Sequence, residues 1–325
     1  MAKGFVPECL YDHHLSAANP FWMGIADRGP PEVTSIHVHN GLEIHLTLSG
    51  LFEFRFGQLA IPVAEGETAL CSMWEPHRVE LRAPEGNSAI AMIFLPEFLA
   101  KGARDAASWM RLFTARAKDR PRVRRARTRE SVLAIGRHLR DEMMGRRNRW
   151  EEMVRLDVLR LLLVLEREWR LPPGKQQIAD IDPADFARVM PAVSRVHADL
   201  SHRVSCAEAA AECGFSESHF RALFRRAMGV GFGWFGLRAR LGFAAHCLTS
   251  TGLPVREIAQ VSAFADLSHF HRVFEKHFGC NPSRYRARTR EERPPGLLPG
   301  FGPHRRATSW FSVHLSEPGV GAVER

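Results

Sequence analysis

Two histidines, His37 and His39, stand two residues apart in a stretch where apolar and polar residues alternate. Side chains two apart on a β-strand point to the same side, so both imidazoles would face one space. This is the geometry that two metal ligands need, because imidazole nitrogens bind several transition metals. The same pair could also hydrogen bond a small ligand or pack inside a β-domain. The pattern therefore leaves a metal, a ligand and plain packing open.

A second kind of chemistry belongs to a helix that carries arginines on its outer side. Ser205 and Glu208 form an S-x-x-E capping box ahead of a small-residue helix, and residues 214–216 make a turn. The next helix, residues 218–228, turns its large apolar residues inward. Four of its residues then face outward: Ser218, Arg221, Ala222 and Arg225. Such a face can enter the major groove of DNA and hydrogen bond base edges.

The same arrangement returns about fifty residues later. Residues 255–261 form a short helix, residues 262–266 a turn and residues 267–278 a second helix with phenylalanines inward. One such pattern is often an ordinary helical hairpin. Two copies joined by a helix instead place two probes on one side of a duplex, and they predict DNA binding.

These two units resemble the AraC/XylS family of bacterial transcription regulators, over roughly the last hundred residues before the tail. The first unit carries the resemblance in Ala210, Gly214, Phe215, Ser216, His219, Phe220, Phe224 and Gly229. The second carries it in Ile258, Ala259, Phe264, Ser268, Phe270, Phe274, Gly279, Pro282, Tyr285 and Arg286. The resemblance implies that bases are contacted by Ser218, Arg221 and Ala222 from the first unit and by Leu267, Ser268, His271 and Arg272 from the second.

Two positions depart from the family pattern. Ala263 stands where the family usually has glycine, and an alanine at positive φ costs about 1 kcal/mol. We therefore expect the second turn to be strained or differently shaped. Ala222 is too short to hydrogen bond a base, so we expect the first helix to rely on Arg221 and Arg225.

The elements ahead of these units are of two kinds. Between residues 35 and 95, apolar residues recur at every second position and glycines punctuate the chain, which predicts short antiparallel strands. Residues 116–129 hold eight Lys or Arg and predict a solvated connector. Two helices should follow, over residues 128–144 and 150–169. The second has apolar residues on two faces, so it is either enclosed by the chain or pairs with its twin in a homodimer, which we favour.

The β-module resembles a cupin in two motifs. His37, His39 and Glu43 fit the first motif, and His77 falls where the second motif has its histidine. The resemblance implies that these four side chains converge, either as a metal set or around an effector. Pro31 replaces the leading glycine of the first motif, and the sensor domain of the AraC/XylS family normally holds a small effector without metal. We therefore predict no metal cofactor and an effector contact for all four residues.

The segment 73–77 is similar to the melibiose-operon regulator branch of the family. That resemblance makes a sugar the first guess for the effector. Trp74 could stack on the face of a sugar ring, although a lone tryptophan is more often part of a core.

Charge divides the chain into unlike parts. Residues 1–100 carry 5 basic and 12 acidic side chains, residues 101–182 carry 21 and 12, and residues 183–290 carry 15 and 8. A polyanion would therefore be repelled by the front and attracted by the back. The six cysteines are scattered without a CxxC pair, which argues against a disulfide framework, a zinc ribbon or a thiol sensor and predicts a cytoplasmic location. No apolar run predicts a membrane span.

The sequence as a whole predicts a multidomain α and β protein. Residues 1–100 are predicted to form a cupin-like antiparallel β-barrel that binds an effector, residues 101–182 a helical linker and dimerisation region, residues 183–290 an all-α DNA-binding domain with two helix-turn-helix units, and residues 291–325 a disordered tail. Its predicted partners are promoter DNA, a small effector, RNA polymerase and a second copy. The protein is predicted to be a regulator rather than an enzyme. The alternative is a cupin metalloenzyme fused to a DNA-binding domain.

Overall fold

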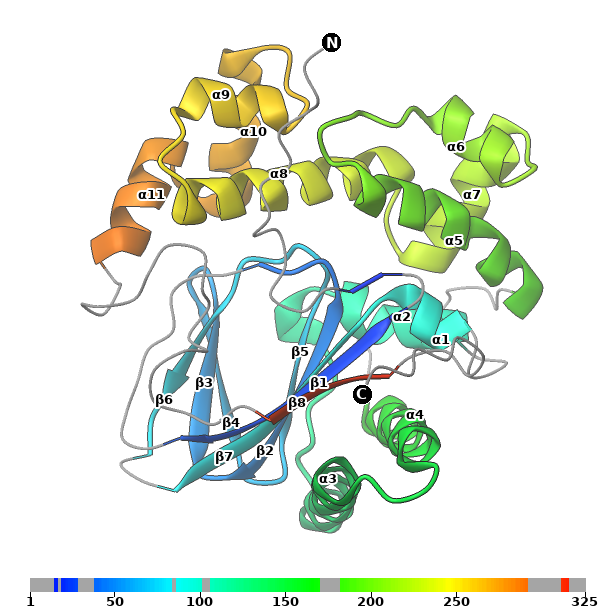
Figure 1. The fold of residues 1–325 in the computed structure, drawn as a ribbon, viewed down its shortest axis with the longest axis vertical. Helices are drawn as coiled ribbons and strands as arrows, with labels where there is room; N and C mark the ends of the chain where they lie inside the picture. The colour runs from blue at the N-terminus through cyan, green and yellow to red at the C-terminus, as the bar shows by residue number, and fades with distance from the viewer. Residues whose placement is uncertain are drawn as a thin grey trace, which may run out of the picture.

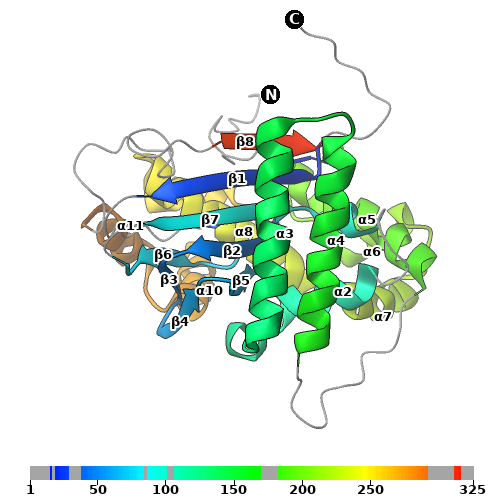
Figure 2. The ribbon, with the colours of Figure 1, turned by 90° about the horizontal axis from the view of Figure 1, so that it is seen from below.

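The computed structural model describes residues 15–16, 19–28, 38–83, 86–100, 106–169, 182–291 and 311–315. Its strands form a β-domain, and the helices from residue 182 onward form a helical domain that lies above the strands in Figure 1. A pair of long helices lies across the strands on another side, as the view from below shows (Figure 2). No helix in the described ranges is long and apolar enough to cross a membrane.

The strands form two separate antiparallel sheets. The larger has the order β5-β2-β7-β1-β8 and the smaller the order β4-β3-β6. The strands are β1 (Phe21–Arg28), β2 (Leu42–Ser49), β3 (Leu51–Phe56), β4 (Leu59–Ala64), β5 (Thr68–Cys71), β6 (Arg78–Leu81), β7 (Asn87–Phe94) and β8 (Phe311–Leu315). The predicted closed cupin-like barrel is not confirmed, because the two sheets are not joined into one. Alternation fixes which side chains face inward, but closure depends on long-range strand pairing that alternation does not encode.

Two strands lie where the sequence predicted none. β1 pairs with β7 over its whole length, and its residues 21–26 are all buried, so no polar face reveals it. β8 pairs with the other edge of β1, from Phe21↔Leu315 to Ile25↔Phe311. The predicted disordered tail is therefore wrong for these five residues, which cover an edge that would otherwise expose unpaired backbone groups.

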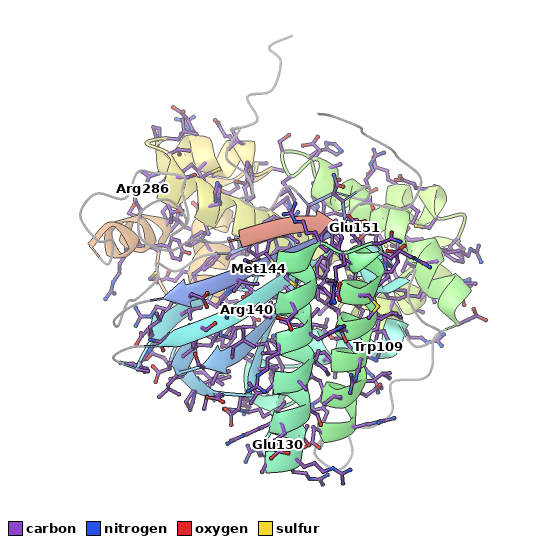
Figure 3. The ribbon with its side chains drawn as sticks, turned by 60° about the horizontal axis from the view of Figure 1, so that its bottom comes forward. Trp109, Glu130, Arg140, Met144, Glu151 and Arg286 are labelled. Atoms are coloured by element: carbon purple, nitrogen blue, oxygen red, sulfur yellow. The ribbon has the colours of Figure 1, made fainter. Side chains whose placement is uncertain are left out.

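The helices that follow the strands are α1 (Pro96–Ala100), α2 (Ala106–Thr114), the short 3-10 helix η1 (Ala117–Asp119), α3 (Ala126–Gly145) and α4 (Trp150–Glu168). α3 packs closely on β2, since a Cβ atom on Gly136 would lie 2.7 Å from Leu48 Cδ2 and 2.8 Å from Leu46 Cδ2. Arg140 anchors the same helix to the sheet through Asp27, at 2.9 Å (Figure 3). Helices α3 and α4 carry four exposed large apolar side chains, the apolar row: Met144, Met153, Leu156 and Leu163.

The basic segment 116–129 is only in part the solvated connector that its charge predicted. Five of its basic side chains are exposed, namely Arg116, Lys118, Arg124, Arg125 and Arg127, and the other three bind the β-domain. Arg120 is buried, donates to the Leu70 carbonyl at 2.7 Å and pairs with Glu75 at 2.7 Å. Arg122 donates to the Pro62 carbonyl at 2.6 Å, and Arg129 pairs with Glu67. These arginines fasten the segment to the β-domain, because carbonyl and carboxylate oxygens there accept their hydrogen bonds.

The helical domain contains both predicted helix-turn-helix units. Its helices are α5 (Pro183–Ala198), α6 (Cys206–Glu212), α7 (Glu217–Met228), α8 (Phe232–Ser250), α9 (Val255–Val261), α10 (Leu267–Phe278) and α11 (Pro282–Glu291). The long helix α8 joins the two units, and in Figure 1 it lies between α9 and the strands. The capping box is confirmed: Glu208 N donates to Ser205 Oγ at 3.2 Å, and Ser205 N donates to Glu208 Oε2 at 2.7 Å.

Candidate functional site

The first candidate surface is the outer side of α7. Ser216 caps this helix, and Phe220, Leu223 and Phe224 are buried against the rest of the unit. These contacts fix the rotation of the helix about its axis. As predicted, four residues lie exposed on the opposite side: Ser218, Arg221, Ala222 and Arg225.

The second unit presents α10 in the same way. Asp266 caps the helix by accepting from Ser268 N and His269 N, both at 3.0 Å, a cap that the sequence analysis missed although Asp is a favoured cap residue. Phe270 and Phe274 are buried beneath it. Of the four predicted contact residues, Leu267, Ser268 and Arg272 are exposed, and His271 is half-buried.

The two turns share a left-handed residue, and the strain predicted for the second turn follows from its residue type. Gly214 in the first turn has φ +70°, and Ala263 in the second has φ +57°. The left-handed region costs alanine about 1 kcal/mol relative to glycine, so the second turn is strained. Arg240 of α8 donates to the Ala263 carbonyl at 2.9 Å and holds this conformation.

Arg221 already has a partner on its own helix. Its guanidinium pairs with Glu217, one turn earlier, through Nε at 3.0 Å and a second, shorter contact. The hydrogen bond that Arg221 donates to Glu217 raises the pKa of Arg221, so the side chain is charged whenever it meets DNA. Because an exposed ion pair of this kind is weak, the arginine can exchange Glu217 for a base edge at little cost.

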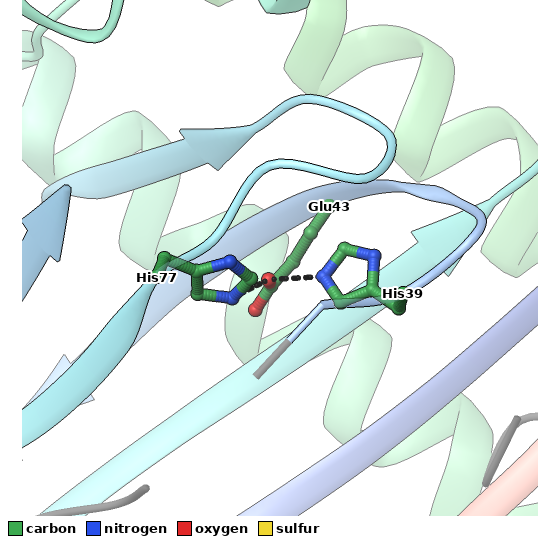
Figure 4. Close-up of side chains that lie close together, drawn as sticks. All are labelled: His39, Glu43 and His77. Atoms are coloured by element: carbon green, nitrogen blue, oxygen red, sulfur yellow. Dashed lines mark hydrogen bonds and ion pairs between the residues drawn. The ribbon is translucent and has the colours of Figure 1, made fainter. Parts of the chain in front are cut away.

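The second candidate site lies in the β-domain and consists of His39, Glu43 and His77, the histidine–glutamate cluster. His39 Nε2 lies 2.9 Å and His77 Nε2 3.1 Å from the same oxygen, Glu43 Oε2 (Figure 4). All three residues are buried, and their ligand atoms lie within 4.8 Å of one another. The structure thus brings three of the predicted effector contacts together, whereas His37 lies outside the described residues.

The backbone orients both imidazoles toward the glutamate. His39 Nδ1 lies 2.9 Å from the Gly41 carbonyl, and His77 Nδ1 lies 2.9 Å from the Glu75 carbonyl. A carbonyl only accepts, so each Nδ1 carries a proton and each Nε2 is directed at Glu43. The cluster can therefore exchange protons and hydrogen bonds with a polar ligand, and its Nε2 atoms would be open to a cation only after giving up the protons that bind Glu43.

Charge in the cluster favours an ionised glutamate. Burial raises the pKa of Glu43, but hydrogen bonds from His39 and His77 outweigh this and hold it well below its usual value. Burial lowers the pKa of His77, but the hydrogen bond to Glu43, the charges of Glu43 and Glu75 and the hydrogen bond to the Glu75 backbone together outweigh this and raise it. Behind Glu43, its strand neighbour Cys71 is buried, and burial raises the pKa of this thiol well above its usual value. Cys71 is a member of this region that the sequence analysis missed.

Trp74, the remaining predicted effector contact, occupies a different place. Its ring is buried with 1% exposure and packs against α8 of the helical domain, where a Cβ atom on Gly242 would lie 2.5 Å from Trp74 Cε3. Its backbone N–H donates to the His39 carbonyl at 2.9 Å. Trp74 therefore touches the cluster through its backbone and the helical domain through its ring.

A family model described as a helix-turn-helix domain matches residues 209–288. The chain is 31% identical over 86 residues to the probable transcriptional regulator LumQ of Photobacterium leiognathi, which covers 26% of this chain and 35% of LumQ. It is 31% identical over 91 residues to the transcriptional activator AarP of Providencia stuartii, which covers 28% of this chain and 67% of AarP.

Among solved structures, the crystal structure of ToxT from Vibrio cholerae O395 aligns with 86% of this chain and 99% of its own, at 13% identity and a TM-score of 0.43. The chain spans about a third of the length of LumQ and two thirds of AarP. The family model, over residues 209–288, covers both helix-turn-helix units described above. The chain belongs to the AraC family of helix-turn-helix transcription regulators.

Proposed function

We propose that the chain is a sequence-specific transcription regulator, an activator that responds to a small polar molecule. The proposal rests on the pair of recognition helices α7 and α10, whose buried phenylalanines hold Arg221 and Arg272 outward. The name of AarP as an activator supports the direction of regulation, and RNA polymerase would then be a partner at the promoter. The effector, a sugar or another polar molecule, would bind His39, Glu43 and His77 in the cytoplasm, and His37, outside the described residues, stays a predicted contact.

The test is DNA binding by the full chain, on a duplex selected by the chain itself from a random pool. Since phosphate contacts release counterions, affinity should fall about a thousandfold between 50 and 200 mM salt. The selected duplex should outcompete a scrambled one at both salt concentrations. Equal affinity for both duplexes would contradict sequence-specific binding. Equal affinity at both salt concentrations would contradict binding through phosphate contacts.

We propose dimerisation through the exposed apolar row on α3 and α4. Leu156 is 59% exposed at its centre, on the side of α4 that faces away from the chain. Leu156→Glu would place an unpaired charge in a contact between two copies, so the dimer dissociation constant should rise about tenfold or more. Analytical ultracentrifugation measures it, with Ala211→Glu on the exposed surface of α6 as the control. A dimer of unchanged strength would refute this interface.

The metal content of the purified chain distinguishes the regulator from the alternative, a cupin metalloenzyme. We expect well under one transition metal per chain, because the cluster is already satisfied when both imidazoles share Glu43 Oε2. His39→Ala should then weaken the response to the effector without changing metal content. Stoichiometric metal in the purified chain by elemental analysis, lost in His39→Ala, would instead favour the enzyme.

A further inference from the structure

One short loop of the β-domain is held by two helices of the helical domain, α5 and α8. Residues 72–77, the docking loop, join β5 to β6. The ring of Trp74 packs on Gly242 of α8 and lies edge-on to His197 of α5, with ring centroids 6.0 Å apart. α8 thus has a glycine where the Trp74 ring packs closely against it.

Polar contacts grip the backbone of the same loop. Arg238 of α8 donates to the Met73 carbonyl at 3.0 Å. His277 of α10 lies edge-on to Trp234 of α8, with ring centroids 6.0 Å apart, and the backbone of Trp74 opposes the lowering of its pKa. Since α10 also carries Ser268 and Arg272, the helix proposed to contact bases is linked to the docking loop through His277 and α8.

The other side of the docking loop belongs to the histidine–glutamate cluster. The loop supplies His77 itself, and its Glu75 carbonyl orients that ring at 2.9 Å. Trp74 N donates to the carbonyl of His39, at 2.9 Å. Arg120 fixes the loop from the β-domain side through Glu75. A shift of either imidazole must therefore move the backbone on which the indole is mounted.

Trp74 is held in a conformation that its residue type disfavours. Its φ is +58°, in the left-handed region that bulky residues rarely adopt. Such strain persists only where surrounding contacts over-determine it, and it makes a second arrangement of the loop accessible once contacts change. The loop therefore has what a two-state element needs: contacts on both sides and a strained pivot.

We propose that the docking loop transmits the state of the histidine–glutamate cluster to α10, with Trp74 as the positioning residue and Gly242 as its seat. The proposal rests on the proposed function of the cluster as the effector site. It adds the path by which occupancy of that site would change the second recognition helix.

Hydrogen exchange in the full chain tests the link without DNA or effector. Glu43→Gln keeps the shape of the side chain while removing the charge that both imidazoles face. This change should alter amide exchange in α10 by about threefold or more. Gly242→Ala should abolish that response, because the added methyl displaces the indole, whereas Gly236→Ala on the same helix should preserve it, since nothing lies within 4 Å of its Cβ position.

Two results would overturn the link: an α10 that ignores Glu43→Gln while β2 responds, or a response that survives in Gly242→Ala. Arg238→Met, which removes the hydrogen bond to Met73, provides a second uncoupling variant if Gly242→Ala lowers protection throughout the helical domain. His77→Gln replaces Glu43→Gln if the latter lowers protection throughout the larger sheet. The exchange experiment measures only the link between the cluster and α10, whereas the regulator function is tested separately by DNA binding. Failure of one is therefore distinguishable from failure of the other.

Discussion

Lowering the pH from about 6.5 to 4 should destabilise the folded chain by about 3 kcal/mol through His197, and by a similar amount through His277. Burial lowers the pKa of His197 from 6.5 to about 4. Burial and then the charge of Arg238 lower that of His277 to about 4, against opposing contributions from the Trp74 backbone and Glu75. Although the His197 residue is only half-buried, both its ring nitrogens are shielded from solvent and lack a partner in the described part of the chain.

The direction follows from which state takes up the proton. Above pH 6.5 the imidazoles are neutral in both the folded and the unfolded chain, so neither contributes to pH dependence. Between 6.5 and 4 only the unfolded chain is protonated, which removes about 1.4 kcal/mol per pH unit for each histidine. Below pH 4 both states are protonated and the loss stops growing.

Urea unfolding of the full chain across this range measures the effect. His197→Leu should remove its share of the pH dependence, because leucine fills the apolar space beside Trp74 and Phe235 without titrating. His202→Leu, at an exposed position, is the matched control and should follow the wild type. Stability curves for wild type and His197→Leu that run parallel from pH 7 to 4 would contradict the burial of a neutral imidazole.

The helical domain was predictable from sequence because its signals are local. Helices α9 and α10 begin and end where the periodicity places them, and the Ser205–Glu208 box marks the start of α6. Even the positive φ of Ala263 follows from a single residue standing in a glycine position. In each case the determinant lies within a few residues of the structure that it sets.

The β-domain was less predictable because its determinants lie far apart in the chain. β1 hides its strand character by being buried on both sides, and β8 joins β1 from almost 300 residues away. From the sequence alone, the arginines at 120, 122 and 129 are predicted to be solvated. Their hydrogen-bond acceptors lie on β4, β5 and the loops beside them, which no local pattern reveals. The candidate cluster was predicted from the cupin motif, but the role of Trp74 at the junction of two domains was not, since no local pattern encodes a contact with Gly242.

Arg221→Ala should cost about 1 to 3 kcal/mol of discrimination between the selected duplex and its single-base variants. Arg221 is exposed on α7, and an arginine there can donate two parallel hydrogen bonds to guanine O6 and N7, which alanine cannot replace. Discrimination should relax at particular base pairs, while weak binding to random DNA should persist. Arg272→Ala should cost less, because the strained turn at Ala263 and the apolar Leu267 make α10 the poorer probe.

Competition binding across a panel of single-base variants, with footprinting on the selected duplex, measures this difference. Arg124→Ala is the matched control, since Arg124 is an exposed arginine outside the helical domain. It should leave base preferences unchanged and, if it meets phosphate at all, lower affinity equally for every sequence and reduce the salt dependence by about one phosphate contact. A footprint and a set of base preferences that survive Arg221→Ala unchanged would mean that α7 does not contact bases. A larger loss from Arg272→Ala than from Arg221→Ala would mean that the second unit dominates recognition despite its strained turn.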